Sequence, residues 1–320
     1  MNNKNILVTS DIPDAGLQLL SEKNFQLDLN SSGETLSGEV LKHRIKNASA
    51  MICLLSEQID AGLLQEAPDL KIIANYAVGY NNIDLDAARA RGIIVTNTPD
   101  VLTAATADLT WALILAVSKR IPESDRFVRE GQFVGWLPQL MLGGDVTSKT
   151  LGIIGAGRIG RAVAKRALGF DMKVLYYGTK RKVEFEKETG ATFVPLTSLL
   201  NNSDFISLHC PLTEDTRHLI NSKNILDIKK GAYLINTARG PIVDEQAMIK
   251  ALNEDHLAGA GLDVYEFEPR VSAELMKMGK VVLLPHIGSA TTETRAEMSR
   301  ICARNIIEVL EGRPAINPVF

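Results

Sequence analysis

Residues Leu151-Gly-Ile-Ile-Gly155-Ala-Gly157-Arg-Ile-Gly160 decide the fold, because they place the pattern G-x-G-x-x-G between an apolar strand and an amphipathic helix. In such a turn Gly155 permits the tight bend, Gly157 lets the backbone approach a pyrophosphate, and Gly160 lets the helix pack closely on the strand. The helix N-terminus then offers unpaired N–H groups to phosphates. A glycine-rich turn without a ligand is the alternative, but a second predicted strand, ending near Tyr177, completes a βαβ unit and favours nucleotide binding.

The rest of the chain extends this pattern. Short β-branched runs alternate with amphipathic stretches from end to end, which predicts an α/β fold. Because 320 residues exceed the size at which one core stops growing, we expect two Rossmann-like, doubly wound parallel-sheet domains. Two long predicted helices, Val101 to Lys119 and Thr292 to Glu311, bracket the second series of strands. We therefore predict a discontinuous substrate-binding domain, 1-98 plus 288-320, and a nucleotide-binding domain, 99-287.

One segment interrupts the alternation. Residues 121–148 hold Pro122, Trp136, Pro138 and a Gly143-Gly144 pair with little periodicity, so we expect them to be irregular. Long irregular segments in compact domains are usually functional or lie in interfaces. We predict an arm that packs on a second subunit, with a plain surface loop as the alternative.

Composition excludes several classes of protein. The formal charge of −3 and the dispersed Lys and Arg residues argue against a nucleic-acid-binding surface. The most apolar predicted helix, about Ala104 to Val117, is too short to span a membrane, and the first residues do not resemble a signal peptide. Cys53, Cys210 and Cys302 form no metal-ligand pattern. We expect a cytoplasmic protein without a metal site.

Three ionisable residues, Arg239, Glu268 and His286, each stand just beyond a different apolar run that is typical of a parallel strand. Ligands of open α/β sheets bind beyond the carboxyl ends of the strands, so we expect the three side chains at one rim. A guanidinium suits a carboxylate, and an imidazole oriented by a carboxylate can protonate a ketone. The set predicts hydride transfer to a 2-keto acid, although Arg239 alone could be a structural cap and Glu268 alone a surface turn.

The end of the second nucleotide strand bears on the choice of cofactor. A site selective for NAD carries Asp or Glu there to bind the ribose 2′-OH. This chain has Gly178, followed by Thr179, Lys180 and Arg181. A hydroxyl and clustered cations can bind a 2′-phosphate, so we predict that NADP(H) is preferred and NAD(H) possible. A solvated helix start in an enzyme that does not distinguish the two is the alternative.

Four motifs together resemble the D-isomer-specific 2-hydroxyacid dehydrogenase family over nearly the whole chain: Gly-Ile-Ile-Gly-Ala-Gly-Arg-Ile-Gly (152–160), Leu-Ile-Asn-Thr-Ala-Arg-Gly (234–240), Gly-Leu-Asp-Val-Tyr-Glu-Phe-Glu-Pro (261–269) and Leu-Pro-His-Ile-Gly-Ser-Ala (284–290). The glyoxylate/hydroxypyruvate reductase branch, which often prefers NADPH, is the most similar, on Cys-Leu-Leu-Ser (53–56), Thr-Pro-Asp-Val-Leu-Thr (98–103) and Gly-Trp-Leu-Pro (135–138). Some relatives have an arm Trp where this chain has Leu140.

The resemblance implies an NAD(P)-dependent oxidoreductase that reduces glyoxylate and hydroxypyruvate, with Arg239 as substrate anchor, His286 as proton donor and Glu268 as its orienting partner. It implies a homodimer joined through helix 101–119 and the 121–148 arm. It also implies an active-site cleft between the two domains, in which backbone N–H groups around Val78 and Gly79 hold the substrate carboxylate. Leu54 is expected as a further substrate contact. The expected cofactor contacts are Thr106, Gly155, Ala156, Gly157, Arg158, Ile159, Gly160, Thr179, Lys180, Arg181, Cys210, Pro211, Thr216, Thr237, Ala238, Arg239, Asp263, His286 and Gly288.

Two other functions remain open. One is a D-2-hydroxyacid dehydrogenase of the same fold that acts on a bulkier 2-keto acid or on phosphoglycerate. The other is a nucleotide-sensing binding protein without catalysis, similar to the corepressors that share the fold. Turnover of NADPH with glyoxylate distinguishes an enzyme from a sensor.

Overall fold

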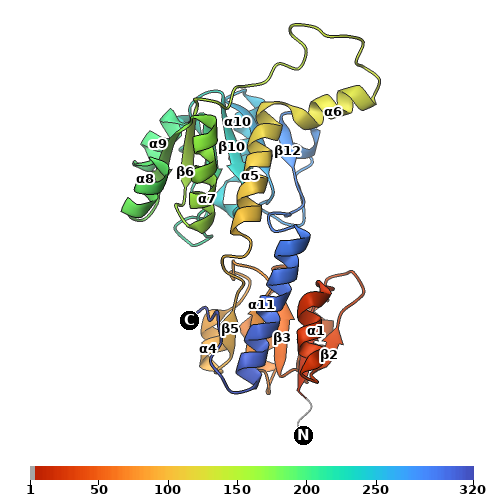
Figure 1. The fold of residues 1–320 in the computed structure, drawn as a ribbon. Coiled ribbons are helices and arrows are strands. Elements are labelled where there is room, and N and C mark those ends of the chain that lie inside the picture. Colours follow the sequence, from red (N-terminus) through yellow and green to blue (C-terminus); the bar gives the residue numbers. More distant parts are fainter. Residues whose placement is uncertain (1–3) are drawn as a thin grey trace. The chain divides into compact units, whose positions relative to one another are not determined.

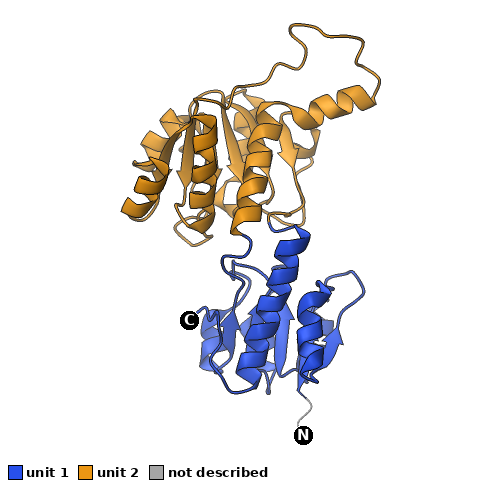
Figure 2. Ribbon diagram, in the orientation of Figure 1, with its two compact units in different colours: residues 1–102, 289–320 blue, residues 103–288 orange. Residues whose placement is uncertain are grey.

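The computed structural model describes residues 4–320, and the chain divides into two compact units (Figure 2). Unit 1 combines the residues up to Leu102 with Ser289–Phe320, and unit 2 is Thr103–Gly288. The junctions lie at 102/103 and 288/289, whereas the sequence placed them at 98/99 and 287/288. No helix within residues 4–320 combines the length and apolar character that a bilayer-spanning segment needs.

Unit 1 is built on a five-stranded parallel sheet of order β2-β1-β3-β4-β5. Successive strand residues face opposite sides, as the two-residue period of a strand requires. Ile6 and Val8 therefore join the core beneath α1 and α11, while Leu7 joins the core beneath α2, α3 and α4. The elements are β1 Asn5–Val8, α1 Asp14–Glu22, β2 Gln26–Leu29, α2 Gly38–Ile45, β3 Ala50–Cys53, α3 Ala61–Gln65, β4 Ile72–Asn75, α4 Leu85–Ala90, β5 Ile94–Thr96 and α11 Thr292–Leu310.

Helices α1 and α11 of unit 1 pack closely because a glycine lies at their contact (Figure 1). A Cβ atom on Gly16 would lie 2.2 Å from the carbonyl oxygen of Ser299. The Gly16 N–H instead donates to the Ser299 hydroxyl at 3.1 Å. The C-terminal helix thus completes the N-terminal sheet, so unit 1 is discontinuous in sequence.

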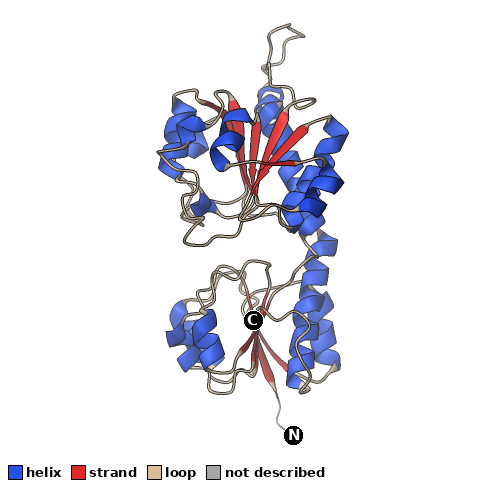
Figure 3. Cartoon of the chain, turned by 90° about the vertical axis from the view of Figure 1, so that its left-hand side faces the viewer, coloured by secondary structure: helices blue, strands red, loops and turns tan. Residues whose placement is uncertain are grey.

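Unit 2 is built on a seven-stranded parallel sheet of order β12-β11-β10-β9-β6-β7-β8, with helices on both faces (Figure 3). One core lies under α9 and α10, and the other under α5, α7 and α8. The elements are α5 Thr103–Ser118, α6 Ile121–Arg129, β6 Thr150–Ile154, α7 Arg158–Ala167, β7 Lys173–Tyr177, α8 Val183–Thr189, β8 Thr192–Phe193, α9 Leu196–Asn202, β9 Phe205–Leu208, β10 Ala232–Asn236, α10 Glu245–Asn253, β11 Leu257–Leu262 and β12 Val281–Leu283, with 3₁₀ turns η1 Leu168–Phe170, η2 Ile225–Asp227, η3 Gly240–Ile242 and η4 Leu275–Lys277. The predicted class, two doubly wound α/β domains, is confirmed.

One prediction about unit 2 is wrong: residues 121–148 are not irregular throughout, because they begin with helix α6. Pro122 does not break this helix, since it lies in the first turn, where its missing N–H has no intrahelical partner to lose. Arg120 precedes the helix and has a φ of 54°, so the chain changes direction between α5 and α6. Ion pairs of Arg120 with Glu123 (2.6 Å) and of Arg129 with Asp125 (2.8 Å) support it. The irregular part of the arm starts after Glu130.

Candidate active site

The three predicted catalytic residues follow three neighbouring strands of the unit 2 sheet. Arg239 follows β10, Glu268 follows β11 and His286 follows β12. Because the strands are parallel, their carboxyl ends lie along one edge of the sheet. There His286 Nδ1 lies 2.9 Å from Glu268 Oε2, and about a third of each side chain is exposed (34% and 35%). The pair is therefore formed, and it remains open to a ligand.

The Glu268 carboxylate is held from two sides. Its Oε2 contacts His286, and its Oε1 accepts the N–H of Tyr265 at 2.9 Å. Burial raises the pKa of Glu268, but the hydrogen bond and charge of His286, the Tyr265 N–H and the Arg239 charge together outweigh it, so this pKa lies below its ordinary value. Glu268 is therefore an anion at neutral pH, which suits it to accept a hydrogen bond from the Nδ1–H group of the imidazole ring.

Arg239 lies in a segment whose backbone is fixed by Asn236, the last residue of β10. The Asn236 side chain donates to the Arg239 carbonyl at 2.9 Å and accepts the Ala238 N–H at 3.0 Å. Burial lowers the pKa of the Arg239 guanidinium, while the Glu268 charge opposes this shift. A partly desolvated guanidinium attracts a carboxylate ligand more strongly than one in bulk water, because less solvent screens it.

The segments that carry Arg239 and Glu268 are packed backbone against backbone. A Cβ atom on Gly240 would lie 1.8 Å from the carbonyl oxygen of Tyr265, so only glycine allows this approach. The Tyr265 hydroxyl in turn donates to the Leu284 carbonyl at 2.8 Å, two residues before His286. The three segments are thereby fixed to one another.

Asp263, the residue after β11, is almost fully buried beside Thr106 and Gly288. Its Oδ1 accepts the Ile287 N–H at 2.7 Å, and its Oδ2 has no hydrogen-bond partner among residues 4–320. The Thr106 hydroxyl donates to the Gly288 carbonyl at 3.0 Å. Burial raises the pKa of Asp263, against the Ile287 N–H and the His286 charge. A buried carboxylate oxygen without a partner suits a ligand that carries hydrogen-bond donors.

The glycine-rich turn has the shape that a dinucleotide requires. Gly155 has a φ of 99°, and a Cβ there would lie 2.5 Å from the Cys210 N atom. A Cβ on Gly160 would lie 2.2 Å from the Gly155 carbonyl oxygen, whereas nothing lies within 4 Å of a Cβ on Gly157. Helix α7 begins at Arg158 without a side-chain cap, so its first N–H groups are available to an anion. The residues present fit the pyrophosphate of a nicotinamide dinucleotide.

Several other predicted cofactor contacts hold the loops of this edge together. Thr216 accepts the Thr213 N–H at 2.7 Å and donates to the Pro211 carbonyl at 2.6 Å, which closes the loop after β9. The Thr237 hydroxyl lies 2.9 Å from that of Thr110 in α5. The loop that contains Cys210 therefore has a defined conformation beside the glycine-rich turn.

Two of the predicted 2′-phosphate ligands differ in their surroundings. Thr179, Lys180 and Arg181 are exposed beyond β7, the neighbour of β6. The Arg181 guanidinium forms an ion pair with Glu186 (2.7 Å), which also accepts the Tyr176 hydroxyl at 2.7 Å. Arg181 would have to exchange this partner for a phosphate, whereas Lys180 has no ion pair within the described chain.

The predicted substrate residues of unit 1 lie beyond the carboxyl ends of β3 and β4. The Gly79 carbonyl accepts from the Asn75 side chain at 2.6 Å, and the Val78 carbonyl from the Asn97 side chain at 2.8 Å. Within residues 4–320 the N–H groups of Val78 and Gly79 donate no hydrogen bond. Leu54 is fixed through its N–H, which donates to Glu57 at 2.6 Å.

Comparison with known proteins then decides the family. Residues 111–288 match the D-isomer specific 2-hydroxyacid dehydrogenase, NAD binding domain family. Over 311 residues the chain is 50% identical to a glyoxylate reductase of Thermococcus litoralis, covering 96% of this chain and 94% of that protein. The chain belongs to the D-isomer-specific 2-hydroxyacid dehydrogenase family. It is an NAD(P)-dependent oxidoreductase that reduces 2-keto acids, and it lies in the glyoxylate reductase branch, so the predicted family and enzyme class are confirmed.

Solved structures of the family agree with this assignment. An NADPH-dependent glyoxylate/hydroxypyruvate reductase from Sinorhizobium meliloti, in complex with NADP and malonate, has a TM-score of 0.87 and 32% identity, covering 99% of this chain and 97% of that chain. A D-lactate dehydrogenase from Aquifex aeolicus, complexed with NAD and lactic acid, has a TM-score of 0.86 and 30% identity, covering 97% and 96%. Both NADP and NAD, which differ by the 2′-phosphate, thus occur in complexes of family members with this fold.

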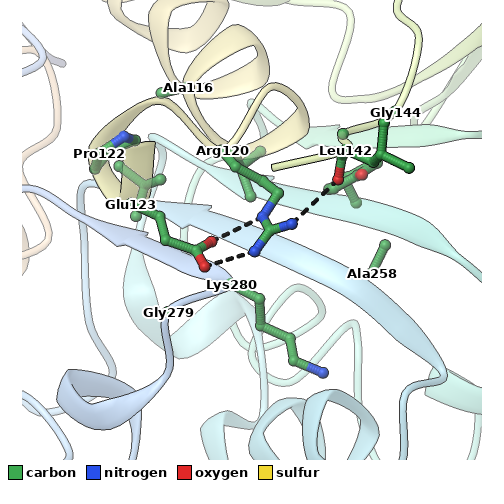
Figure 4. Close-up of a pocket in the computed structure, with 13 residues that line it drawn as sticks. Ala116, Arg120, Pro122, Glu123, Leu142, Gly144, Ala258, Gly279 and Lys280 are labelled. Atoms are coloured by element: carbon green, nitrogen blue, oxygen red, sulfur yellow. Dashed lines mark hydrogen bonds and ion pairs between the residues drawn. The ribbon is translucent and has the colours of Figure 1, made fainter. Parts of the chain in front are cut away.

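A cavity of about 450 Å³ in this dehydrogenase lies away from the catalytic trio (Figure 4). Its walls come from the amino ends of β10, β11 and β12, from the end of α5, and from the arm at its start and at residues 142–144. The ion pair of Arg120 and Glu123 forms one side, and Lys280 forms another. Because the trio follows the carboxyl ends of the same strands, this cavity is not the predicted active site.

Two contacts of the dehydrogenase site were not predicted from the sequence. Lys182 donates to the Ala156 carbonyl at 2.8 Å, inside the glycine-rich turn. Tyr265 orients Glu268 through its backbone N–H. The cationic residues 180–182 could have indicated the Lys182 contact. The Tyr265 contact is made by a backbone N–H, so the type of side chain does not predict it.

Proposed function

We propose that this dehydrogenase reduces glyoxylate and hydroxypyruvate to glycolate and D-glycerate with NADPH, and that His286 is the proton donor. The observation that carries the proposal is the 2.9 Å contact of His286 Nδ1 with Glu268 Oε2, on the strand edge that also bears Arg239 and the glycine-rich turn. Oxidoreductase chemistry on 2-keto acids needs an anchor, a proton donor and a dinucleotide site, and this edge supplies all three.

Each of the three side chains has one task in the proposed reaction. Arg239 binds the carboxylate of the 2-keto acid through its planar fork of N–H donors. Protonated His286 gives its Nε2 proton to the ketone oxygen, which becomes the hydroxyl of the product while the ring becomes neutral. Glu268 accepts the Nδ1 proton in a hydrogen bond, so that it orients the ring and stabilises its cationic form. When bound, the nicotinamide supplies the hydride that reaches the carbonyl carbon.

The cofactor would be held mainly by the turn from Gly155 to Gly160 and the start of α7. Thr106, Asp263 and Gly288 lie together in unit 2 and suit its polar nicotinamide end. Preference for NADPH is supported by the absence of a carboxylate directly after β7 and by the exposed cations Lys180 and Arg181. The related Sinorhizobium meliloti enzyme is likewise described as NADPH-dependent.

Leu54, Val78 and Gly79 of unit 1 are proposed as further substrate contacts, whereas the nucleotide contacts proposed above all lie in unit 2. The N–H groups of Val78 and Gly79 donate to no acceptor within the described residues, while two asparagine side chains fix the carbonyls of the same residues. Such a loop is suited to a carboxylate. Leu54 would add an apolar contact that limits the size of the substrate. All three cysteines are free, which supports a reducing compartment such as the cytoplasm.

A homodimer is also proposed, with α5 and the arm as its interface. The arm exposes Val134 (91%) and Trp136 (81%) together with Phe133, Leu137 and Leu142. Figure 1 shows this segment extending from the body of unit 2. An apolar cluster of this kind is typical of a surface that a partner covers. Light scattering should give twice the chain mass for the wild type, and Trp136→Glu should shift it towards the monomer; an unchanged monomer for both would reject the proposal.

The experiment that tests the function is a panel of glyoxylate, hydroxypyruvate, pyruvate and phosphohydroxypyruvate, each with NADPH and NADH. We expect kcat/KM to be highest for the first two acids, and about tenfold higher with NADPH, a margin of roughly 1.4 kcal/mol. The lactate dehydrogenase relative favours one alternative, a dehydrogenase of a bulkier 2-keto acid. A higher kcat/KM for pyruvate than for glyoxylate and hydroxypyruvate would contradict the proposed substrate, and a higher kcat/KM with NADH would contradict the proposed cofactor. Cofactor binding without turnover would indicate a sensor.

A further inference from the structure

We propose that His218 and Glu266 are positioning residues of the reduction, because they fix the turn that carries Glu268 against the segment that follows Arg239. The inference rests on the proposed roles of Glu268 and His286. It assigns a task to a second histidine–glutamate pair that lies outside the predicted site.

The pair belongs to a small polar cluster in unit 2. His218 Nε2 lies 2.7 Å from Glu266 Oε1, and Glu266 Oε2 accepts the N–H of Glu245 at 3.0 Å. The Glu266 N–H in turn donates to the Glu245 carboxylate at 3.3 Å. Only 12% of the Glu266 side chain is exposed, against 40% for His218, and Glu245 is buried. Two carboxylates so close together and so little hydrated need donors, and His218 supplies one.

On one side the cluster reaches the turn of Glu268. Glu266 directly follows Tyr265, whose N–H holds Glu268 Oε1 at 2.9 Å. The peptide between Tyr265 and Glu266 is also the one that packs on Gly240. A shift of the Glu266 side chain would therefore be passed to the N–H group that orients the Glu268 carboxylate.

On the other side the cluster reaches the segment after Arg239. The backbone N–H of His218 donates to the Pro241 carbonyl at 2.8 Å, and the backbone N–H of Ile220 donates to the Ile242 carbonyl at 3.2 Å. Glu245, the partner of Glu266, is the first residue of α10. The loop at His218 thus ties residues 239–245 to residues 265–268.

Loss of the His218–Glu266 contact should affect the catalytic rate more than the stability of unit 2. His218 is 40% exposed, so water can take over its contact with Glu266, and losing the contact should leave unit 2 folded. Catalysis is more sensitive, because a misplacement of about 1 Å at a reacting group can cost roughly a hundredfold in rate. The main effect of breaking the contact should therefore appear in kcat.

The backbone of His218 suggests the variants. Its φ of 50° is in the left-handed region, which asparagine tolerates better than most residues. His218→Asn removes the contact, because its amide is too short to reach Glu266, without adding backbone strain. His218→Gln keeps a donor near the position of Nε2. His256→Leu is the matched control: His256 also makes one hydrogen bond, 2.8 Å from the Ile228 carbonyl, but it precedes the amino end of β11.

The measurements are kcat for glyoxylate reduction and Kd for NADPH by calorimetry. We expect His218→Asn to lower kcat about tenfold with an unchanged Kd, His218→Gln to stay within about threefold of the wild type, and His256→Leu to keep its kcat. Wild-type kcat in His218→Asn, an equal loss in His218→Gln, or an equal loss in His256→Leu would overturn the proposal. His286→Asn is assayed in parallel: if it is inactive while His218→Asn is fully active, only the positioning role fails, and if it is fully active, the proton-donor role proposed for His286 fails. No glyoxylate reduction by the wild type would reject the proposed function itself.

Discussion

At the scale of single residues, the His286–Glu268 pair is arranged for orientation rather than for stability. About a third of each side chain is exposed, and pairs of this kind contribute little to folding. The same contact, together with the Tyr265 N–H and Arg239, keeps the pKa of Glu268 below its ordinary value against the opposing effect of burial. The carboxylate therefore stays charged next to the ring that we propose as the proton donor.

Glu186 is the residue that we expect to limit the preference for NADPH. Its carboxylate binds the Arg181 guanidinium at 2.7 Å, so a 2′-phosphate must compete for the same donors. Glu186→Gln should lower the KM for NADPH about threefold to tenfold and leave the KM for NADH unchanged. Glu184→Gln is the control, because Glu184 is on the same helix but pairs with Lys187 at 3.0 Å. Equal changes for both cofactors, or the same gain in Glu184→Gln, would exclude a role for Glu186.

At the scale of elements, the six residues from Gly155 to Gly160, between the end of β6 and the first turn of α7, contain glycines that the fold requires and a glycine that we expect to matter only for cofactor binding. Gly155 and Gly160 are required by close backbone contacts, whereas the space around Gly157 is open. The sequence motif alone does not distinguish these roles, but the distances do.

Gly160→Ala should therefore affect mainly the stability of unit 2, and Gly157→Ala mainly the binding of the cofactor. The first places a methyl group 2.2 Å from the Gly155 carbonyl oxygen, and it should destabilise unit 2 by roughly 1–3 kcal/mol, visible as a lower Tm. The second should keep the wild-type Tm but weaken binding of NADPH and NADH at least about tenfold, because the methyl group occupies the space that the pyrophosphate needs. Wild-type affinity in Gly157→Ala would show that the dinucleotide does not bind at this turn.

At the scale of the whole molecule, the sequence predicted what depends on short-range pattern. The parallel sheets follow from alternating strands and helices, and the three site residues of unit 2 follow from their places after β10, β11 and β12. Helix α6 was missed because residues 121–148 show little periodicity and hold Pro122, although the first turn of a helix accepts proline. The His218–Glu266 contact joins residues 48 apart in sequence, so no local pattern marks it.

Stability should depend on pH through His209, a half-buried residue that directly follows β9 and lies beside Gly155. Burial lowers the pKa of His209 to about 3, from an ordinary value of 6.5. As pH falls below about 6.5, the unfolded chain gains a proton that the folded chain does not, so stability is lost towards acid, by up to about 1.4 kcal/mol per pH unit.

His209→Gln, which can keep the contact with the Ser207 hydroxyl, should flatten this decline between pH 6.5 and 5. Tm measured across that window checks the prediction. His43→Gln, which changes an exposed histidine of unit 1, should follow the wild-type slope. If the slope of His209→Gln equals that of the wild type, protonation of His209 does not contribute to acid destabilisation.

The main proposal is that His286, oriented by Glu268, protonates the ketone while Arg239 holds the carboxylate. Its most direct test is kcat for glyoxylate reduction by His286→Asn, a change that the φ of 55° at this position tolerates, with the Kd for NADPH measured on the same protein. We expect a loss in kcat of at least about a hundredfold with an unchanged Kd. A kcat within about threefold of the wild type would contradict it.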